Sequence, residues 1–340
     1  MKQNNFNFLR FSFAFVVVIG HLIEISKVSS FQKFAPYFNT YISVTAFFCI
    51  SGFLITLSYL NTPKLKDYLK KRAARLLPAY IFVILSSVFF LAFISRYSFQ
   101  EYFTHPMLFK YLGANFTFLN FIEPCLPGVF LNESGCFVNG ALWTLKIEVS
   151  FYLAIPVILY FIRKTKLKYI WLIGIYIVSV FYRSTLDHFS THQGLEYLTI
   201  LSRQLPGFLS YFVCGIGLYY YFNSFIRNKK ILLVISLVIF IVERKFGVEF
   251  LTPFALSTIV FFIAYSFTKL NNFAKHGDIS YGIYIFHYPI MKIATNFGFF
   301  EKYNPVLVSL VIVLLVILTG YASWHLIEKK FLIKSHSTRI

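Results

Sequence analysis

The sequence predicts an all-α, polytopic integral membrane protein of about ten transmembrane helices, with the N- and C-termini in the cytoplasm. Three observations lead to this prediction: the composition, the spacing of the apolar runs and the distribution of basic residues. The 340-residue chain is 58% hydrophobic and only 13% charged, with a mean hydropathy of +0.68. That composition excludes an ordinary soluble domain. The formal net charge of +19 therefore indicates basic loops at the inner membrane surface, and no nucleic-acid partner is expected.

Ten apolar runs account for the predicted helices, and most approach the roughly 20 residues needed to cross about 30 Å of hydrocarbon. They cover about residues 6–26, 37–60, 77–95, 141–162, 167–182, 204–222, 231–243, 251–268, 279–297 and 305–327. The runs at 167–182 and 231–243 are short and require flanking Lys or Arg that reach the interface. We interpret residues 96–140 as an outer loop with an interfacial piece, because a crossing there would move every later basic loop outside.

Basic residues collect in alternate loops. Residues 61–76 hold six Lys or Arg and residues 163–168 hold four, with further clusters at 223–230 and in the C-terminal tail. Cytoplasmic loops carry such an excess, so the alternation places both termini inside. We expect one membrane-embedded domain over residues 1–333 and a short cytoplasmic tail over 334–340.

Two cysteines of the predicted outer loop, Cys125 and Cys136, are in a compartment where the medium can be oxidising, so we hypothesise a disulfide between them. Cys49 and Cys214 lie in apolar runs, where small core residues are the ordinary interpretation.

Ionisable residues inside the first helix point to chemistry. Arg10 and His21 are eleven residues apart, which returns them to nearly one face about 16 Å apart along the axis. Glu24 follows on the same face and either orients the imidazole or marks the outer boundary. The alternative is an anchoring arginine and a hydrogen-bonded packing histidine.

Arg72 and Arg75 lie three residues apart just before Pro78, a spacing that suits two guanidiniums holding one phosphorylated ligand at the inner surface. A basic cluster contacting anionic membrane lipid is the competing interpretation.

Glu148 lies about seven residues into a helix that enters from the outside, at a predicted depth similar to that of His21. A carboxylate and an imidazole buried together in a bilayer suggest acid/base catalysis, and a structural ion pair is the alternative.

Six motifs carry these residues in order along essentially the whole chain. Besides the Arg10–His21 spacing they are "FFCISGFLIT", "KRAARLLPAY", "LWTLKIEVSFY", "GDISYGIYIFHYPI" and "HLIEKKF". Together they resemble acyltransferase family 3, the integral-membrane O-acyltransferases that modify bacterial cell-surface carbohydrates.

The resemblance implies a multi-pass enzyme of the bacterial inner membrane that takes an acyl group, usually acetyl, from cytoplasmic acyl-coenzyme A. The acceptor would be a hydroxyl of a cell-envelope glycan, reached directly or through a separate periplasmic partner, and a homo-oligomer is also open. His21 matches the essential histidine of the family and Glu148 its fourth-helix glutamate. Arg10, Arg72 and Arg75 match the arginines thought to engage coenzyme A.

In the resulting mechanism neutral His21 is a general base on the acceptor hydroxyl, with Glu148 or Glu24 fixing its tautomer, or it forms an acyl-histidine intermediate. Tyr281, Tyr284 and His287 either line the acceptor or pantetheine channel or are packed and hydrogen-bonded in the bundle. No ligand spacing suggests a metal site.

The rival hypothesis from another class is a proton-coupled secondary transporter or flippase that uses the buried histidine and glutamate as a proton relay.

Overall fold

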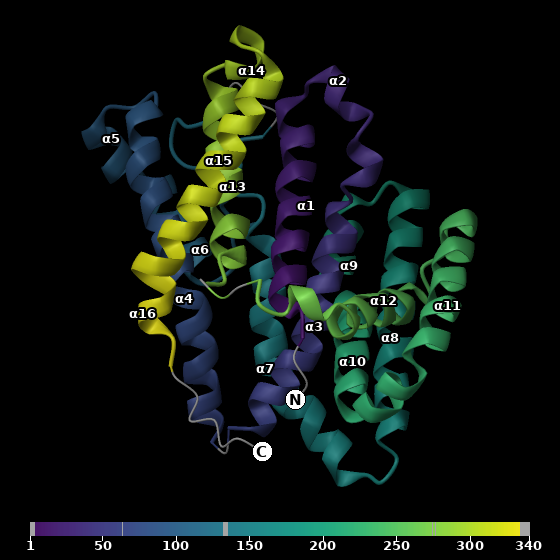
Figure 1. Cartoon of the computed structure of the whole chain (residues 1–340). Helices are drawn as coiled ribbons and strands as arrows, with labels where there is room; N and C mark the ends of the chain where they lie inside the picture. The colour runs from purple at the N-terminus through teal and green to yellow at the C-terminus, as the bar shows by residue number, and fades with distance from the viewer. Residues whose placement is uncertain (1–3, 63, 132–134, 274, 276, 334–340) are drawn as a thin grey trace. The chain divides into compact units, whose positions relative to one another are not determined.

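A computed structural model describes residues 4–62, 64–131, 135–273, 275 and 277–333 (Figure 1). The described residues are helical and contain no strand, which confirms the all-α prediction for them. The chain forms two compact units that alternate along the sequence. Unit 1 comprises residues 1–13, 41–69 and 147–274, and unit 2 comprises 14–40, 70–146 and 275–340. The expected tail at 334–340 lies outside the described residues.

Unit 1 is built mainly from five long or medium-length helices and one short one. They are α3 (Thr40–Leu60), α8 (Lys168–Gln193), α9 (Glu196–Ser202), α10 (Leu205–Tyr220), α11 (Phe222–Phe246) and α12 (Thr252–Ser266). Within this unit α8 packs against α10, and α11 packs against α12.

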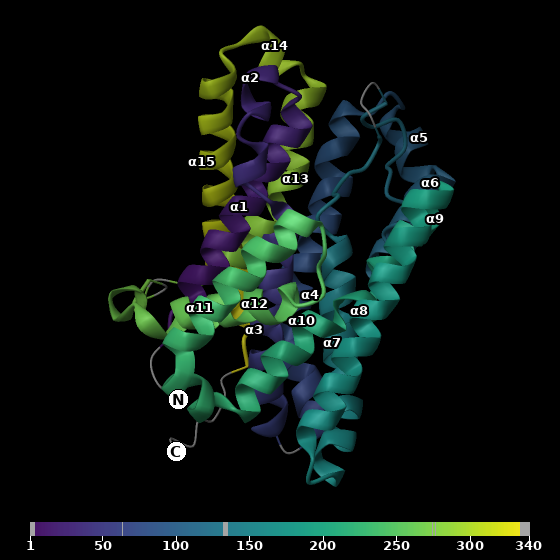
Figure 2. The same cartoon turned by 90° about the vertical axis from the view of Figure 1, so that its right-hand side faces the viewer.

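Unit 2 contains short helices that precede α7 (Trp143–Lys164) in the chain and the C-terminal helices. They are α2 (Ser29–Gln32), α5 (Phe99–Thr104), α6 (Pro106–Phe116), α13 (Ser280–Asn296), α14 (Phe299–Lys302), α15 (Pro305–Ser323) and α16 (Lys329–Phe331). Figures 1 and 2 show α13 and α15 running next to each other, joined at one end by α14. Besides α3, whose first residue falls in unit 2, three helices are divided between the units: α1 (Phe6–Ser26), α4 (Leu65–Leu91) and α7.

Each of the ten predicted runs corresponds to one helix, but the helix bounds differ from the runs. α8 has 26 residues and α11 has 25, so both are longer than the apolar runs that mark them, because polar residues extend the helix ends. α4 begins at Leu65 and continues through Pro78, where the apolar pattern suggested a start near residue 77. Among the described residues, six helical segments are long and apolar enough to cross a membrane by length and composition. A count of ten crossings, and the side on which the termini lie, stay predictions.

The long interruption at 96–140 folds into two short helices in the described part of the chain. α6 has 11 residues, which at 1.5 Å per residue gives about 16 Å, roughly half of the hydrocarbon thickness. The α6 helix is therefore too short to cross the membrane.

Small residues allow a close contact between two helices of unit 1. A methyl group built on Gly52 of α3 would lie 2.0 Å from the Phe212 carbonyl oxygen of α10, and one on Gly215 would lie 2.2 Å from the Cys49 carbonyl oxygen. The two backbones thus touch at paired glycines, because small residues let helices approach closely.

The same device joins α13 to α15 in unit 2. A methyl group on Gly282 would lie 2.8 Å from the Cα atom of Gly320. This contact fixes α13, the helix that carries most of the site described next.

Candidate active site

The side chain of His21 is hydrogen-bonded to a second histidine. Its Nδ1 atom lies 2.8 Å from Nε2 of His287, and the two rings are stacked with an interplanar angle of 13°. His287 is completely buried, whereas His21 is partly accessible. Both residues belong to unit 2, His21 on α1 and His287 on α13. The structure therefore gives His21 an imidazole as its hydrogen-bond partner, where the sequence had suggested a carboxylate.

The backbone of α13 defines the environment of His287. Nδ1 of His287 is 3.3 Å from the carbonyl oxygen of Ile283, one turn earlier in the helix. Pro289 within α13 has no N–H to give to the carbonyl of Ile285. The side-chain amide of Asn139 donates to that carbonyl at 2.8 Å instead, so the residues preceding α7 are attached to the helix.

The predicted outer loop closes over this part of α13. Gly140 approaches the ring of Tyr288 so closely that a methyl group on it would lie 2.7 Å from the ring, and that ring packs edge-on against His21. Lys292 of α13 donates to the carbonyl of Gly135 at 3.1 Å. The loop and the two histidines thus form one packed assembly within unit 2.

Cys125 and Cys136 form a disulfide in the structure, as hypothesised, with their Cα atoms 5.2 Å apart. The bond closes the segment that leads into Asn139 and Gly140. Cys49 and Cys214 are free, and Cys49 is buried in α3.

A second polar cluster in unit 2 holds Arg75. Its Nη2 atom lies 2.5 Å from Oδ2 of Asp278, with the side chains 18% and 11% exposed, and its guanidinium lies over the ring of Trp324, 5.6 Å from the centroid. Ser280, at the start of α13, donates to the other oxygen of Asp278. Sequence reasoning missed Asp278 as a partner, although it stands in the motif "GDISYGIYIFHYPI".

Glu148 belongs to unit 1, where its carboxylate accepts from the hydroxyl of Ser51 at 3.1 and 2.9 Å. Ser51 precedes the paired-glycine contact of α3, so the "FFCISGFLIT" and "LWTLKIEVSFY" motifs meet at this hydrogen bond. The catalytic role expected for Glu148 stays a prediction.

The remaining predicted residues fall in the following places. Arg10 lies on the same continuous helix as His21, and Arg72 lies on α4 one turn before Arg75; both side chains are partly buried. Glu24 is exposed on α1. Their expected roles stay predictions.

The three predicted substrate-binding residues of α13 all make hydrogen bonds within the protein. The hydroxyl of Tyr281 donates to the Leu76 carbonyl at 3.0 Å, and that of Tyr284 lies 2.7 Å from the Thr144 hydroxyl. These contacts, with the buried pairing of His287, agree with the packed alternative that the sequence left open.

In the described part of the chain, no group of three or more His, Cys, Asp or Glu residues is placed to hold a metal ion.

Comparison with known proteins places the chain in a family. A family model described as an acyltransferase domain matches residues 3–325. An O-acetyl transferase of Shigella phage Sf6 is 26% identical over 346 residues, covering 98% of this chain and 97% of the relative. Nodulation protein 10 of Rhizobium leguminosarum bv. viciae is 27% identical over 324 residues, covering 87% and 85%. No solved structure matches the chain significantly.

The fold and these matches define a multi-pass membrane protein of the acyltransferase class. The chain belongs to acyltransferase family 3, which confirms the resemblance carried by the six motifs. It is therefore an enzyme, and the paired histidines of unit 2 are its candidate catalytic centre.

Proposed function

We propose that this acyltransferase moves an acetyl group from cytoplasmic acetyl-coenzyme A to a hydroxyl of a cell-envelope glycan, such as an O-antigen, lipooligosaccharide, capsule or exopolysaccharide. Family membership and the relative named O-acetyl transferase support the reaction class. The observation that carries the mechanism is the hydrogen bond between His21 and the buried His287. It leaves one nitrogen of His21 for proton transfer.

The protonation of the pair follows from its acceptors. The carbonyl of Ile283 can only accept, so Nδ1 of His287 carries a proton when the two are hydrogen-bonded. Neutral His287 then has an unprotonated Nε2, which accepts from Nδ1–H of His21. Neutral His21 is thereby held in the tautomer whose Nε2 has a free lone pair, the form that a general base requires.

In the proposed reaction His21 first accepts a proton and then donates it. Nε2 takes the proton of the acceptor hydroxyl as its oxygen attacks the thioester carbonyl, and the new C–O bond replaces the C–S bond. The proton passes from Nε2 to the departing sulfur of coenzyme A. His287 accepts from Nδ1–H throughout, so it steadies the imidazolium without changing its own protonation. Attack by Nε2 itself, giving an acyl-histidine, is the alternative order of events.

The donor would be held by the arginines of the inner surface. Arg10, Arg72 and Arg75 are candidates for the phosphates of coenzyme A, because guanidinium groups make charge-assisted bidentate contacts to phosphate. Asp278 accepts from Arg75 and so limits the directions in which its other N–H groups can point. Binding of cytoplasmic coenzyme A by these arginines requires that the termini lie in the cytoplasm and that the protein lies in the bacterial inner membrane.

Glu148 and Glu24 stay candidate catalytic carboxylates. Tyr281 and Tyr284 then support α13 and do not contact substrate. A homo-oligomer, or a separate periplasmic protein that hands on the acyl group, remains compatible with this proposal, and membrane lipid surrounds the enzyme.

The test is acetyl transfer and thioester hydrolysis by the purified protein in liposomes, with labelled acetyl-coenzyme A and His21→Ala alongside. We expect release of coenzyme A by the wild type and its loss in the variant at equal protein level. An active His21→Ala protein contradicts the mechanism. If the wild type neither turns over acetyl-coenzyme A nor binds coenzyme A, the proposal that acetyl-coenzyme A is the donor is wrong. The proton-coupled transporter then becomes the leading hypothesis.

A further inference from the structure

A polar cavity of about 450 Å³ lies in unit 1, and none of the site residues described above lines it. The C-terminal half of α8, the start of α10 and the segment between α11 and α12 form its walls. The charged, histidine and tyrosine residues of its lining are Arg183, Asp187, His188, His192, Tyr211 and Glu249. A volume of this size falls within the range of small-molecule binding sites.

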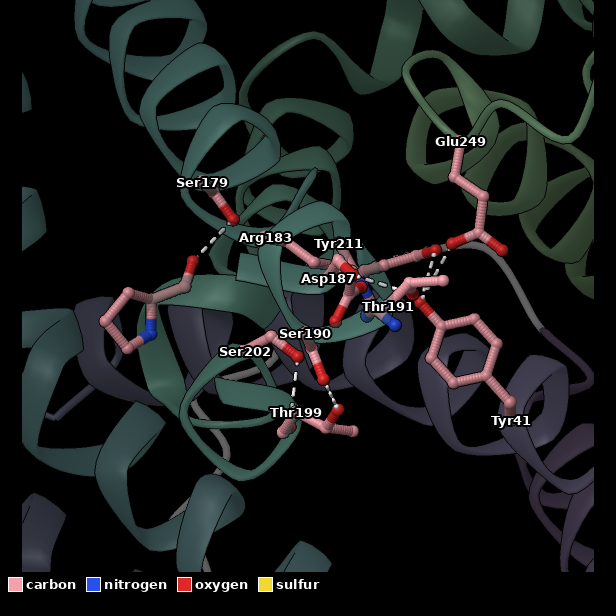
Figure 3. A network of polar contacts seen from close by, with 11 residues as sticks. Tyr41, Ser179, Arg183, Asp187, Ser190, Thr191, Thr199, Ser202, Tyr211 and Glu249 are labelled. Atoms are coloured by element: carbon pink, nitrogen blue, oxygen red, sulfur yellow. Dashed lines mark hydrogen bonds and ion pairs between the residues drawn. The ribbon is translucent and has the colours of Figure 1, made fainter. Parts of the chain in front are cut away.

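Arg183 is the central group of this wall (Figure 3). Its guanidinium lies over the ring of Tyr41, 4.5 Å from the centroid, and its Nε atom is 3.3 Å from Oδ2 of Asp187. The side chain is 16% exposed. Among the residues that the structure describes, the buried Nη1 atom of Arg183 has no hydrogen-bond partner. A buried guanidinium N–H without an acceptor is costly, so a ligand oxygen there would be stabilising.

Acceptor groups next to Arg183 are held in place by the fold. The hydroxyl of Tyr41 lies 3.1 Å from that of Tyr211 and donates to Glu249 at 3.3 Å (Figure 3). Buried Glu243 of α11 accepts from the backbone N–H of Leu251 and from the hydroxyl of Thr252, which ties down the segment bearing Glu249. The cavity is therefore a built site and not a gap beside a free loop.

The charges of the lining indicate the chemistry of the ligand. One guanidinium faces two carboxylates, Asp187 and Glu249, so with neutral histidines the cavity has a formal charge of −1. An anionic ligand is disfavoured by that balance. Donors and acceptors alternate over a short distance beside tyrosine rings, which suits a ligand whose hydroxyl groups both donate and accept. The second cavity of unit 1, about 610 Å³ and lined by residues such as Leu172, Ile173 and Val213, is apolar and lacks this character.

The position of the cavity along α8 indicates on which side of the membrane it lies. α8 begins at Lys168, at the end of the basic loop 163–168 that the charge pattern places in the cytoplasm, and the cavity lies in the other half of the same helix. It is thus expected on the extracytoplasmic side, where the glycan acceptor is available.

We propose that this cavity binds a neutral sugar unit of the acceptor glycan, with Arg183, Asp187 and Glu249 as the residues that contact its hydroxyls. The inference rests on the proposed function for the identity of the glycan as substrate.

The test is direct binding of the purified full-length protein to a printed array of bacterial surface oligosaccharides, with Arg183→Gln and Glu249→Gln. Thr185→Ala is the matched control, because Thr185 is exposed on the same helix but does not line the cavity. We expect glycan binding that weakens roughly tenfold or more in Arg183→Gln, the loss of a charged hydrogen bond, and stays unchanged in Thr185→Ala. Lipopolysaccharide in vesicles, offered with the same variants, distinguishes a lipid-linked glycan from a free one.

Each outcome bears on the cavity separately from the reaction. Oligosaccharide binding by the wild type that persists unchanged in both cavity variants overturns the proposal, as does a wild type that binds no carbohydrate in either form. A wild type that binds sugar through Arg183 but never turns over acetyl-coenzyme A leaves the cavity in place and contradicts the proposed function.

Discussion

Replacing His287 tests the catalytic pair most sharply. His287→Leu keeps much of the side-chain volume but removes Nε2, the acceptor that lies 2.8 Å from Nδ1 of His21. His287→Gln offers a carbonyl oxygen in a similar place. The comparison separates the hydrogen bond from the packing of a buried ring, because both variants fill the site.

The magnitude follows from the lost acceptor. Leaving a buried N–H without a partner costs about 1–3 kcal/mol, and 1.36 kcal/mol corresponds to tenfold in rate. We therefore expect kcat for acetyl-coenzyme A turnover to fall about 5- to 150-fold in His287→Leu and to recover largely in His287→Gln. His21→Ala removes the base itself and should cost roughly 10²–10⁴-fold.

The double variant His21→Ala/His287→Leu decides how His287 acts. If His287 works only by orienting His21, the double variant is no slower than His21→Ala, because effects of residues that act as a unit do not multiply. Multiplied losses would show that His287 contacts substrate independently, which is one of the two alternatives that the sequence left open. Full activity of His287→Leu refutes the pairing altogether. Thr295→Ala, also on α13, is the matched control, because the hydroxyl of Thr295 donates to the carbonyl of Met291 one turn earlier in the same helix.

Three further predictions concern the frame around the site. Asp278→Asn removes the charge that holds Arg75, and we expect the KM for acetyl-coenzyme A to rise about tenfold, with an unchanged KM contradicting a donor role for this arginine. Gly52→Ala places a methyl group against the α10 backbone and should destabilise the fold by about 1–3 kcal/mol or more through overpacking. The yield of folded protein after detergent extraction should therefore fall sharply. A variant that gives as much monodisperse protein as the wild type would refute the contact. Cys125→Ser removes the disulfide that closes a loop with a sequence separation of 11, and it should lower the free energy of unfolding by about 3 kcal/mol. Reductant should destabilise the wild type by a similar amount and leave the variant unchanged.

Much of the fold was accessible from the sequence because the bilayer imposes length and polarity on every crossing helix. Each of the ten apolar runs corresponds to one helix in the structure. Helix ends were less accessible: α8 and α11 continue past their apolar runs, since an amphipathic end can remain helical at an interface. The outer-loop disulfide could be proposed because only two cysteines lie in that loop.

The sequence by itself determined the membrane class and the family and singled out His21 as a candidate, because composition and ordered motifs are properties of the chain. Only the tertiary structure decided what each motif touches. It pairs His21 with His287 across 266 positions and Arg75 with Asp278 across 203, while Glu148 takes Ser51 as a partner. Helical periodicity shows which residues share a face of one helix, but it contains no information on which other helix packs against that face. That choice depends on close contacts such as Gly282 against Gly320, which exist only in the folded bundle.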